Sequence, residues 1–127
     1  FYEAVENGKY TSFIKENTSM PMLYMDDAID ATIKLMTAPK EDVKIRYSYN
    51  LGGMRFTPKE LADEIKKTMP DFEIKYEPDF RQEIADSWPA SIDDSAAKRD
   101  WGLNYKYDLS SMSIDMINNL KIKLRKS

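Results

Sequence analysis

The residues best suited to bind a small molecule lie in one stretch without regular hydrophobic spacing, where Arg81 follows Phe80 and precedes Ser87-Trp88-Pro89. Arginine offers a planar fork of N–H donors to a carboxylate or phosphate, and tryptophan can close a pocket and exclude water. The alternative is a surface arginine and a core tryptophan, since tryptophan is usually mostly buried. Arg81 and Trp88 are therefore candidate substrate-binding residues.

Tyr24 is the third candidate, because it stands with Met25 between an apolar run and an acidic helix start. The ends of strands present side chains to ligands in α/β folds. A tyrosine that only packs is the alternative interpretation, since tyrosine is commonly half-buried.

The usual catalytic residue types are missing or lack the required spacing. The sequence contains no Cys and no His, which excludes a cysteine nucleophile, thiolate metal sites and the usual histidine base. It contains neither a G-x-G-x-x-G loop nor a Tyr-x-x-x-Lys pair. We therefore expect no catalytic and no cofactor-binding residue in this chain.

Two pairs of adjacent carboxylates could in principle hold a hard cation, namely Asp26/Asp27 and Asp93/Asp94. Both pairs stand at predicted helix starts, where an aspartate accepts backbone N–H bonds and meets the positive end of the helix dipole. Capping is the favoured interpretation, and we expect no metal site.

Composition narrows the class of protein further. Among 127 residues, 42% are hydrophobic and 32% charged, which fits one globular α/β domain. The formal charge of −3 argues against nucleic-acid binding, and no apolar run approaches the ~20 residues of a membrane span. We expect a cytoplasmic protein that binds neither nucleic acid nor membrane.

Helices and short strands alternate along the sequence. Apolar spacing and cap residues predict helices at 1–7, 28–36, 57–69, from Ser91 to Gly102, and from Asp108 to Leu124. Alternation and apolar runs predict strands at 10–15, 21–25, 45–51 and 72–76. Thr57-Pro58-Lys59-Glu60 is a capping box with proline at the first helical position.

The two ends differ in character. Phe1 and Val5 share a helical face but nothing precedes them to cap the helix, so we expect a C-terminal piece of a longer protein. The end of the last predicted helix is basic, which is typical of a solvated helix terminus. The basic residues are Lys121, Lys123, Arg125 and Lys126. The alternative to a solvated helix terminus is a tail that binds a membrane surface.

Several motifs in order resemble the extended short-chain dehydrogenase/reductases. These are Met22-Leu23-Tyr24-Met25-Asp26-Asp27-Ala28, Tyr49-Asn50-Leu51-Gly52, Thr57-Pro58-Lys59-Glu60-Leu61, and the segment from Ile84 to Gly102. The specific string Trp88-Pro89-Ala90-Ser91-Ile92-Asp93-Asp94-Ser95 is similar to the NAD-dependent L-threonine 3-dehydrogenase branch of that family. The resemblance covers essentially all 127 residues.

The resemblance implies that residues 1–127 form the single C-terminal substrate-binding lobe of a two-lobed α/β enzyme, with mixed short strands and about four to five helices. The full-length protein would be a homodimer that oxidises L-threonine to 2-amino-3-ketobutyrate. NAD and the Ser/Thr-Tyr-Lys catalytic set would belong to an N-terminal Rossmann lobe absent from this chain, so the isolated chain would be inactive.

Carried over by position, Trp88 matches a pocket-side tryptophan of the family, and Arg81 matches an arginine region that faces pyrophosphate in sugar-nucleotide relatives. Tyr24 departs from the family pattern, because many relatives have His there, and Trp101-Gly102-Leu103 replaces the usual ending. Two alternatives stay open: a lobe of a sugar-nucleotide epimerase or dehydratase, and a non-catalytic binding or assembly module.

Overall fold

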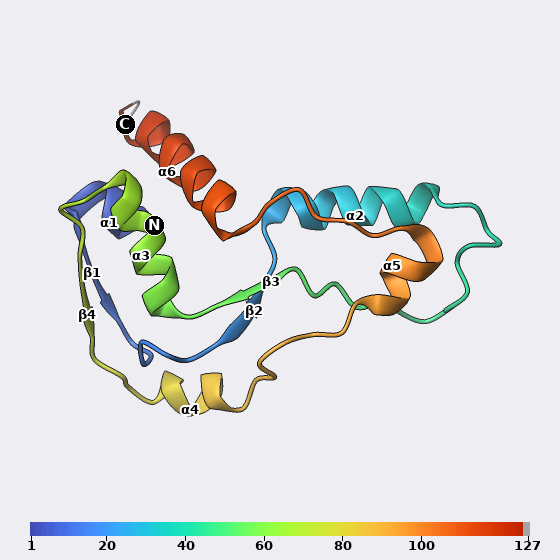
Figure 1. Cartoon of the computed structure of the whole chain (residues 1–127), viewed down its shortest axis with the longest axis horizontal. Coiled ribbons are helices and arrows are strands. Elements are labelled where there is room, and N and C mark those ends of the chain that lie inside the picture. The colour runs from blue at the N-terminus through green and yellow to red at the C-terminus, as the bar shows by residue number, and fades with distance from the viewer. Residues whose placement is uncertain (126–127) are drawn as a thin grey trace.

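The computed structural model describes residues 1–125 and combines six helices with two small sheets in that range (Figure 1). The elements in chain order are α1 (Tyr2–Asn7), β1 (Lys9–Ser12), β2 (Met20–Met22), α2 (Met25–Thr37), β3 (Met54–Phe56), α3 (Pro58–Thr68), β4 (Glu73–Tyr76), α4 (Arg81–Asp86), α5 (Ser95–Trp101) and α6 (Leu109–Arg125). The mixed α and β content confirms the predicted fold class.

Each sheet has two strands and brings together distant parts of the sequence. Strand β1 pairs with β4 in parallel, with Lys9 opposite Glu73. Strand β2 pairs with β3 antiparallel, with Met20 opposite Phe56. Since two-stranded sheets are marginal by themselves, the helices packed beside them must supply much of the stability.

Two separate hydrophobic clusters hold the helices. The first joins α1, α3 and α6 near the two termini, through the buried residues Ala4, Ala62, Ile65, Phe72 and Ile117. The second joins α2 and α5 at the opposite end of the molecule in Figure 1, through Ala31, Ala97, Trp101 and Leu103. The fold is therefore elongated between two small cores.

Cap residues that were predicted from the sequence are confirmed. Helix α3 begins at Thr57, where the side chain accepts from the Glu60 N–H and the Glu60 carboxylate accepts in return. Helix α1 ends at Gly8 in the left-handed conformation (φ 69°). At α6 the Asp108 carboxylate accepts from the Ser111 N–H at 2.8 Å. Lys126 of the predicted basic terminus lies outside the described residues.

The strand predicted at 45–51 is wrong, because residues 43–53 form an irregular segment that pairs with no strand. The alternation there serves side-chain contacts instead. The Tyr49 hydroxyl accepts from the N–H groups of Lys44 and Ile45 and donates to Asp100, while its ring meets Trp101 edge-on at 5.7 Å.

Two further expectations need correction near the candidate residues. The stretch from Phe80 to Trp88 contains the short helix α4 rather than only irregular chain. Helix α5 begins after Asp94, so Ser91 does not cap it. The additional helix brings the number in the described residues to six, one more than expected.

The predicted capping role of Asp27 is also corrected. Its buried carboxylate does not cap its own helix but accepts from the N–H groups of Lys106 and Tyr107, at 2.8 and 3.1 Å. It thereby fastens the segment that leads into α6 onto the start of α2. Within residues 1–125, no helix is both long and apolar enough to cross a membrane.

Candidate functional site

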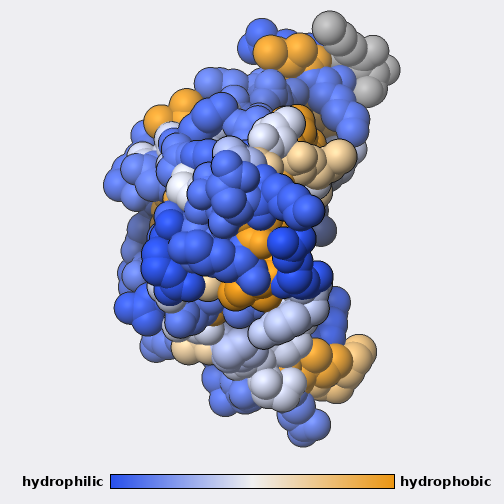
Figure 2. All heavy atoms as spheres, turned by 90° about the vertical axis from the view of Figure 1, so that its right-hand side faces the viewer, coloured by the Kyte–Doolittle hydropathy of each residue, from blue (hydrophilic) through white to orange (hydrophobic). Residues whose placement is uncertain are grey.

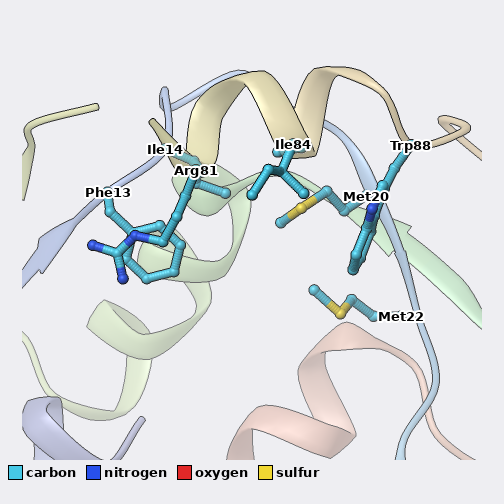
Figure 3. A pocket seen from close by; sticks show the side chains of 8 residues that line it. Phe13, Ile14, Met20, Met22, Arg81, Ile84 and Trp88 are labelled. Atoms are coloured by element: carbon cyan, nitrogen blue, oxygen red, sulfur yellow. The ribbon is translucent and has the colours of Figure 1, made fainter. Parts of the chain in front are cut away.

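A pocket of about 310 Å³ lies between α4 and the segment from the end of β1 to β2 (Figure 3). Its walls are apolar except for one arginine, and the lining residues are Phe13, Ile14, Met20, Met22, Arg81, Ile84, Ala85 and Trp88. Two of the three predicted site residues, Arg81 and Trp88, therefore line one cavity.

Helix α4 is held in place by one of its own residues, Gln82, whose side chain is buried. The Gln82 amide oxygen accepts from the Lys15 N–H at 2.6 Å, and its nitrogen donates to Thr18 at 3.0 Å and to Asp86 at 2.6 Å. Because these bonds join the helix to the loop between β1 and β2, they fix one wall of the pocket against the other.

The opposite wall depends on a close approach of two backbones. A Cβ atom on Gly53 would lie only 2.3 Å from the carbonyl oxygen of Met22, and Gly53 has a positive φ of 62°. Glycine is the residue that meets both demands without strain. It lets β3 lie beside β2, whose Met20 and Met22 line the pocket.

Arg81 lies at one end of the pocket, with its guanidinium carbon 3.5 Å from the centre of the Phe13 ring. Its fork is already occupied by Asp79: Nε lies 3.0 and 3.1 Å from the two carboxylate oxygens, and Nη2 lies 2.6 Å from Oδ2. The hydrogen bonds from Arg81 lower the pKa of Asp79, so this carboxylate is charged at neutral pH. Arg81 thus already holds a carboxylate beside the cavity.

Trp88 lies at the far end of the pocket from Arg81 and points toward Met20 and Met22 (Figure 3). It is 52% exposed, whereas Trp101 is 6% exposed within the second hydrophobic cluster. The interpretation of Trp88 as a core tryptophan is therefore wrong. Its exposed ring can cover a bound molecule.

Tyr24 does not line this pocket. It precedes α2, and its hydroxyl donates to the carboxylate of Asp115 on α6, while its ring meets Tyr107 edge-on at 4.6 Å. The hydrogen bond to Asp115 is the main cause that raises the pKa of Tyr24. These contacts join α2 to α6, and a binding role for Tyr24 stays a prediction.

The second carboxylate pair connects segments of the chain. Asp93 accepts from the Ser95 N–H at 2.9 Å, a local turn at the start of α5. Asp94 accepts from the Tyr105 hydroxyl at 2.7 Å and the Gly52 N–H at 3.3 Å, and pairs with Lys98 at 2.7 Å. Asp94 stands at the N-cap of α5 as predicted, but its carboxylate does not cap the helix, because it bonds to distant residues instead.

The pocket can bind a small molecule, but its side chains are poorly suited to catalyse a reaction by proton transfer. Its lining contains one permanent cation and no carboxylate, hydroxyl or other group suited to move a proton. Sequence reasoning missed Asp79, Gln82 and the apolar wall. Asp79 could have been found from its place two residues before Arg81, but the contacts of Gln82 with residues 15–18 depend on the tertiary fold.

Comparisons with known proteins show which proteins this chain is similar to. No protein-family model matches the chain. It is 48% identical over 124 residues to an uncharacterized epimerase/dehydratase of Staphylococcus haemolyticus, which covers 97% of this chain and 39% of that protein. It is 44% identical over 119 residues to the mitochondrial L-threonine 3-dehydrogenase of Bos taurus, over 93% of this chain and 32% of that one.

Among solved structures, the L-threonine dehydrogenase from Phytophthora infestans superposes with a TM-score of 0.93 at 46% identity, over 97% of this chain and 40% of that one. The fold is thus that of a C-terminal portion of extended short-chain dehydrogenase/reductases. The chain spans about two fifths or less of the length of these relatives. It corresponds to the C-terminal part of proteins of the L-threonine 3-dehydrogenase and epimerase/dehydratase family.

Proposed function

We propose that residues 1–127 are the single substrate-binding lobe of a longer oxidoreductase that oxidises L-threonine to 2-amino-3-ketobutyrate with NAD. The observation that carries the proposal is that Arg81 and Trp88 line one pocket, in a chain 44% identical to an L-threonine 3-dehydrogenase. Arg81 would bind the substrate carboxylate, and Trp88 with Met20 and Met22 would cover the methyl end and exclude water. Tyr24, which contacts Asp115 beyond this pocket, would act on the substrate only indirectly.

NAD would be bound outside this chain. The sequence lacks the glycine-rich loop that cradles a pyrophosphate, and the lining of the α4 pocket contains no glycine. The residues present therefore do not fit a dinucleotide, and the hydride acceptor belongs to the rest of the protein. The isolated chain should accordingly be inactive. A homodimer and a cytoplasmic location belong to the same proposal.

A lobe of a sugar-nucleotide epimerase or dehydratase is the second candidate. It is favoured by the name of the relative from Staphylococcus haemolyticus, which is 48% identical. The nearly complete apolar lining of the pocket argues against it, because a sugar ring needs several hydrogen-bond partners.

The experiment uses a hybrid enzyme, in which this chain replaces the matching segment of the L-threonine dehydrogenase from Phytophthora infestans. We expect Trp88→Ala to raise the KM for L-threonine by about tenfold or more and to leave the KM for NAD nearly unchanged, because one apolar pocket contact is worth roughly that factor. The measurement is the initial rate of NADH formation at varied concentrations of each substrate.

Tyr47→Ala is the matched control, since Tyr47 is an exposed aromatic residue away from the pocket. It should change neither constant. An equal loss for L-threonine and NAD in Trp88→Ala would contradict the proposed role of the pocket.

A further inference from the structure

Helix α4 has little hydrophobic packing to hold it beside the pocket. It has six residues, too few for a helix to be stable by itself, and its buried residues are Gln82 and Ala85. Among residues 1–125, neither of the two hydrophobic clusters includes a residue of α4. The position of this helix must therefore come largely from other contacts.

The surroundings of α4 are open on more than one side. In Figure 1 the helix lies at the lower edge of the molecule, apart from the packed group of α1, α3 and α6. Figure 2, which is turned about the vertical axis, shows an outline hollowed along one side between the upper and lower parts. A second cavity of about 340 Å³ shares Ala85 and Trp88 with the α4 pocket and reaches Thr18 and Asp86. Two cavities thus flank the end of α4.

Gln82 supplies the contacts that hydrophobic packing does not. Its side chain is buried, and both of its polar atoms are engaged. The bond to Asp86 stays within α4, whereas the bonds to Lys15 and Thr18 reach the loop between β1 and β2. A buried amide that loses its partners is costly, so the helix is stable where all of these bonds form.

The same helix carries both candidate binding residues. Arg81 directly precedes Gln82, and Trp88 follows the end of α4 by two residues. We propose that Gln82 is a positioning residue for L-threonine, which sets Arg81 and Trp88 against the opposite wall of the pocket without touching the substrate. Gln82 is accordingly not among the residues that line the pocket. The proposal rests on the proposed function, because it takes L-threonine as the ligand of this pocket.

The hydrogen bond between Gln82 and Asp86 can be reversed to test this role. Gln82→Glu removes the donor and brings two carboxylates together, whereas the double variant Gln82→Glu/Asp86→Asn lets the asparagine nitrogen donate to the glutamate. The Lys15 N–H and the Thr18 hydroxyl can donate to the same glutamate. The double variant therefore restores the whole set of bonds.

The measurement is the steady-state rate of NADH formation by the hybrid enzyme. We expect Gln82→Glu to raise the KM for L-threonine by about tenfold, and to leave kcat and the KM for NAD nearly unchanged, because only substrate binding is misaligned. The double variant should return the KM for L-threonine to within about twofold of the parent value. Asp86→Asn alone should have little effect, since its oxygen still accepts from Gln82.

Asp100→Asn is the control for a merely structural loss. Asp100 is also buried and also joins distant segments, through Tyr49, but it does not line the pocket. This variant should lower the Tm and leave the KM for L-threonine unchanged. A Gln82→Glu variant that behaves in the same way would overturn the proposal. A double variant that binds L-threonine as weakly as Gln82→Glu would also overturn it.

Oxidation of Met20 and Met22 tests the position of α4 without any substrate. Both methionines are half-buried, and Trp88 points toward them (Figure 3). Hydrogen peroxide converts exposed methionine to the sulfoxide, and burial slows that reaction. We expect Gln82→Glu to speed the oxidation of both severalfold in the hybrid, as followed by mass spectrometry of peptides, and the double variant to reverse this. Met112, which is buried elsewhere, should react equally slowly in all variants.

Unchanged oxidation of Met20 and Met22 in Gln82→Glu would overturn the role of Gln82 in placing the helix. A hybrid that shows the expected oxidation pattern but leaves L-threonine unoxidised would support the placement of α4 by Gln82 and refute the substrate. The failure of the positioning role and the failure of the proposed function are thus distinguishable.

Discussion

At the scale of single residues, Arg81 and Asp79 form the part of the pocket with the clearest chemical meaning. The guanidinium stacks on Phe13 and holds both oxygens of a carboxylate that is supplied by the chain itself. A substrate carboxylate that binds Arg81 must therefore compete with Asp79. The pair is exposed, and exposed ion pairs are weak enough to exchange.

Removal of the charge of Asp79 should therefore favour substrate binding. In the hybrid enzyme, we expect Asp79→Asn to lower the KM for L-threonine by up to about fivefold, the range of an exposed ion pair. Asparagine keeps an oxygen that can accept from the Arg81 N–H at the start of α4, so the helix should remain intact.

Asp63→Asn is the control for this change, because Asp63 forms a similar exposed pair with Lys59 on α3, away from the pocket. It should leave the KM for L-threonine unchanged. A rise of KM in Asp79→Asn would show that Asp79 orients Arg81 for the substrate instead of competing with it.

At the scale of elements, local signals predicted most of the fold. The capping box of α3, the glycine after α1 and the aspartate before α6 are short-range features, and each marks the observed boundary. The strand expected at 45–51 was wrong because Tyr49 and Leu51 alternate to meet the second cluster, a contact that depends on distant residues. Helix α4 was missed because its buried residues, the polar Gln82 and the small Ala85, form no hydrophobic periodicity.

The residues of the pocket also divide into those that the local sequence predicts and those that depend on the tertiary fold. Arg81 and Trp88 could be selected from their residue types and from the irregular spacing around them. The opposite wall could not, because Met20 and Met22 reach the pocket through the close approach of β2 and β3 at Gly53. Sequence spacing does not reveal such a backbone contact.

Glycine at position 53 should accordingly be essential to the β2–β3 pair. Gly53→Ala puts a methyl group against the Met22 carbonyl and also strains a positive φ, whereas Gly8→Ala strains only φ because no atom lies within 4 Å of its added Cβ. We expect Gly8→Ala to cost about 1 kcal/mol in free energy of unfolding and Gly53→Ala distinctly more. Urea unfolding of both variants is the measurement, and equal losses would contradict this account of the pocket wall.

The segment 43–53 should detach in acid. Burial alone would raise the pKa of Asp100, but the hydrogen bond from Tyr49 and the charge of Arg99 outweigh it, so the net pKa is lowered. A carboxyl group with a lowered pKa in the folded state stabilises that state above its unfolded pKa of about 3.9. The stabilisation is then lost as the pH falls below about 4 through the folded pKa.

Trp101 reports on this event, because Tyr49 contacts its ring. In a Trp88→Phe background, the Trp101 fluorescence should stay constant from pH 7 to about 5 and change below about pH 4. Asp100→Asn should abolish that part of the pH dependence. A transition of unchanged size in Asp100→Asn would assign it to other carboxylates.

At the scale of the whole molecule, the chain has two small hydrophobic cores, a pocket without groups for proton transfer and an exposed apolar face on α2. These features are typical of one part of a longer protein. The relatives, which are about two and a half times as long as this chain, support the same view. Under the proposed function, the chain would hold the substrate. The chemistry would come from the remainder of the full-length protein.

The most direct test of this account is the rate of NAD reduction by the hybrid enzyme with L-threonine, beside the isolated chain, together with the amount of UDP-galactose that each protein converts. We expect NADH formation that depends on L-threonine in the hybrid, none from the isolated chain, and no conversion of UDP-galactose by either protein. A hybrid that folds with a native-like Tm yet leaves L-threonine unoxidised, or an isolated chain that turns it over, would contradict the account.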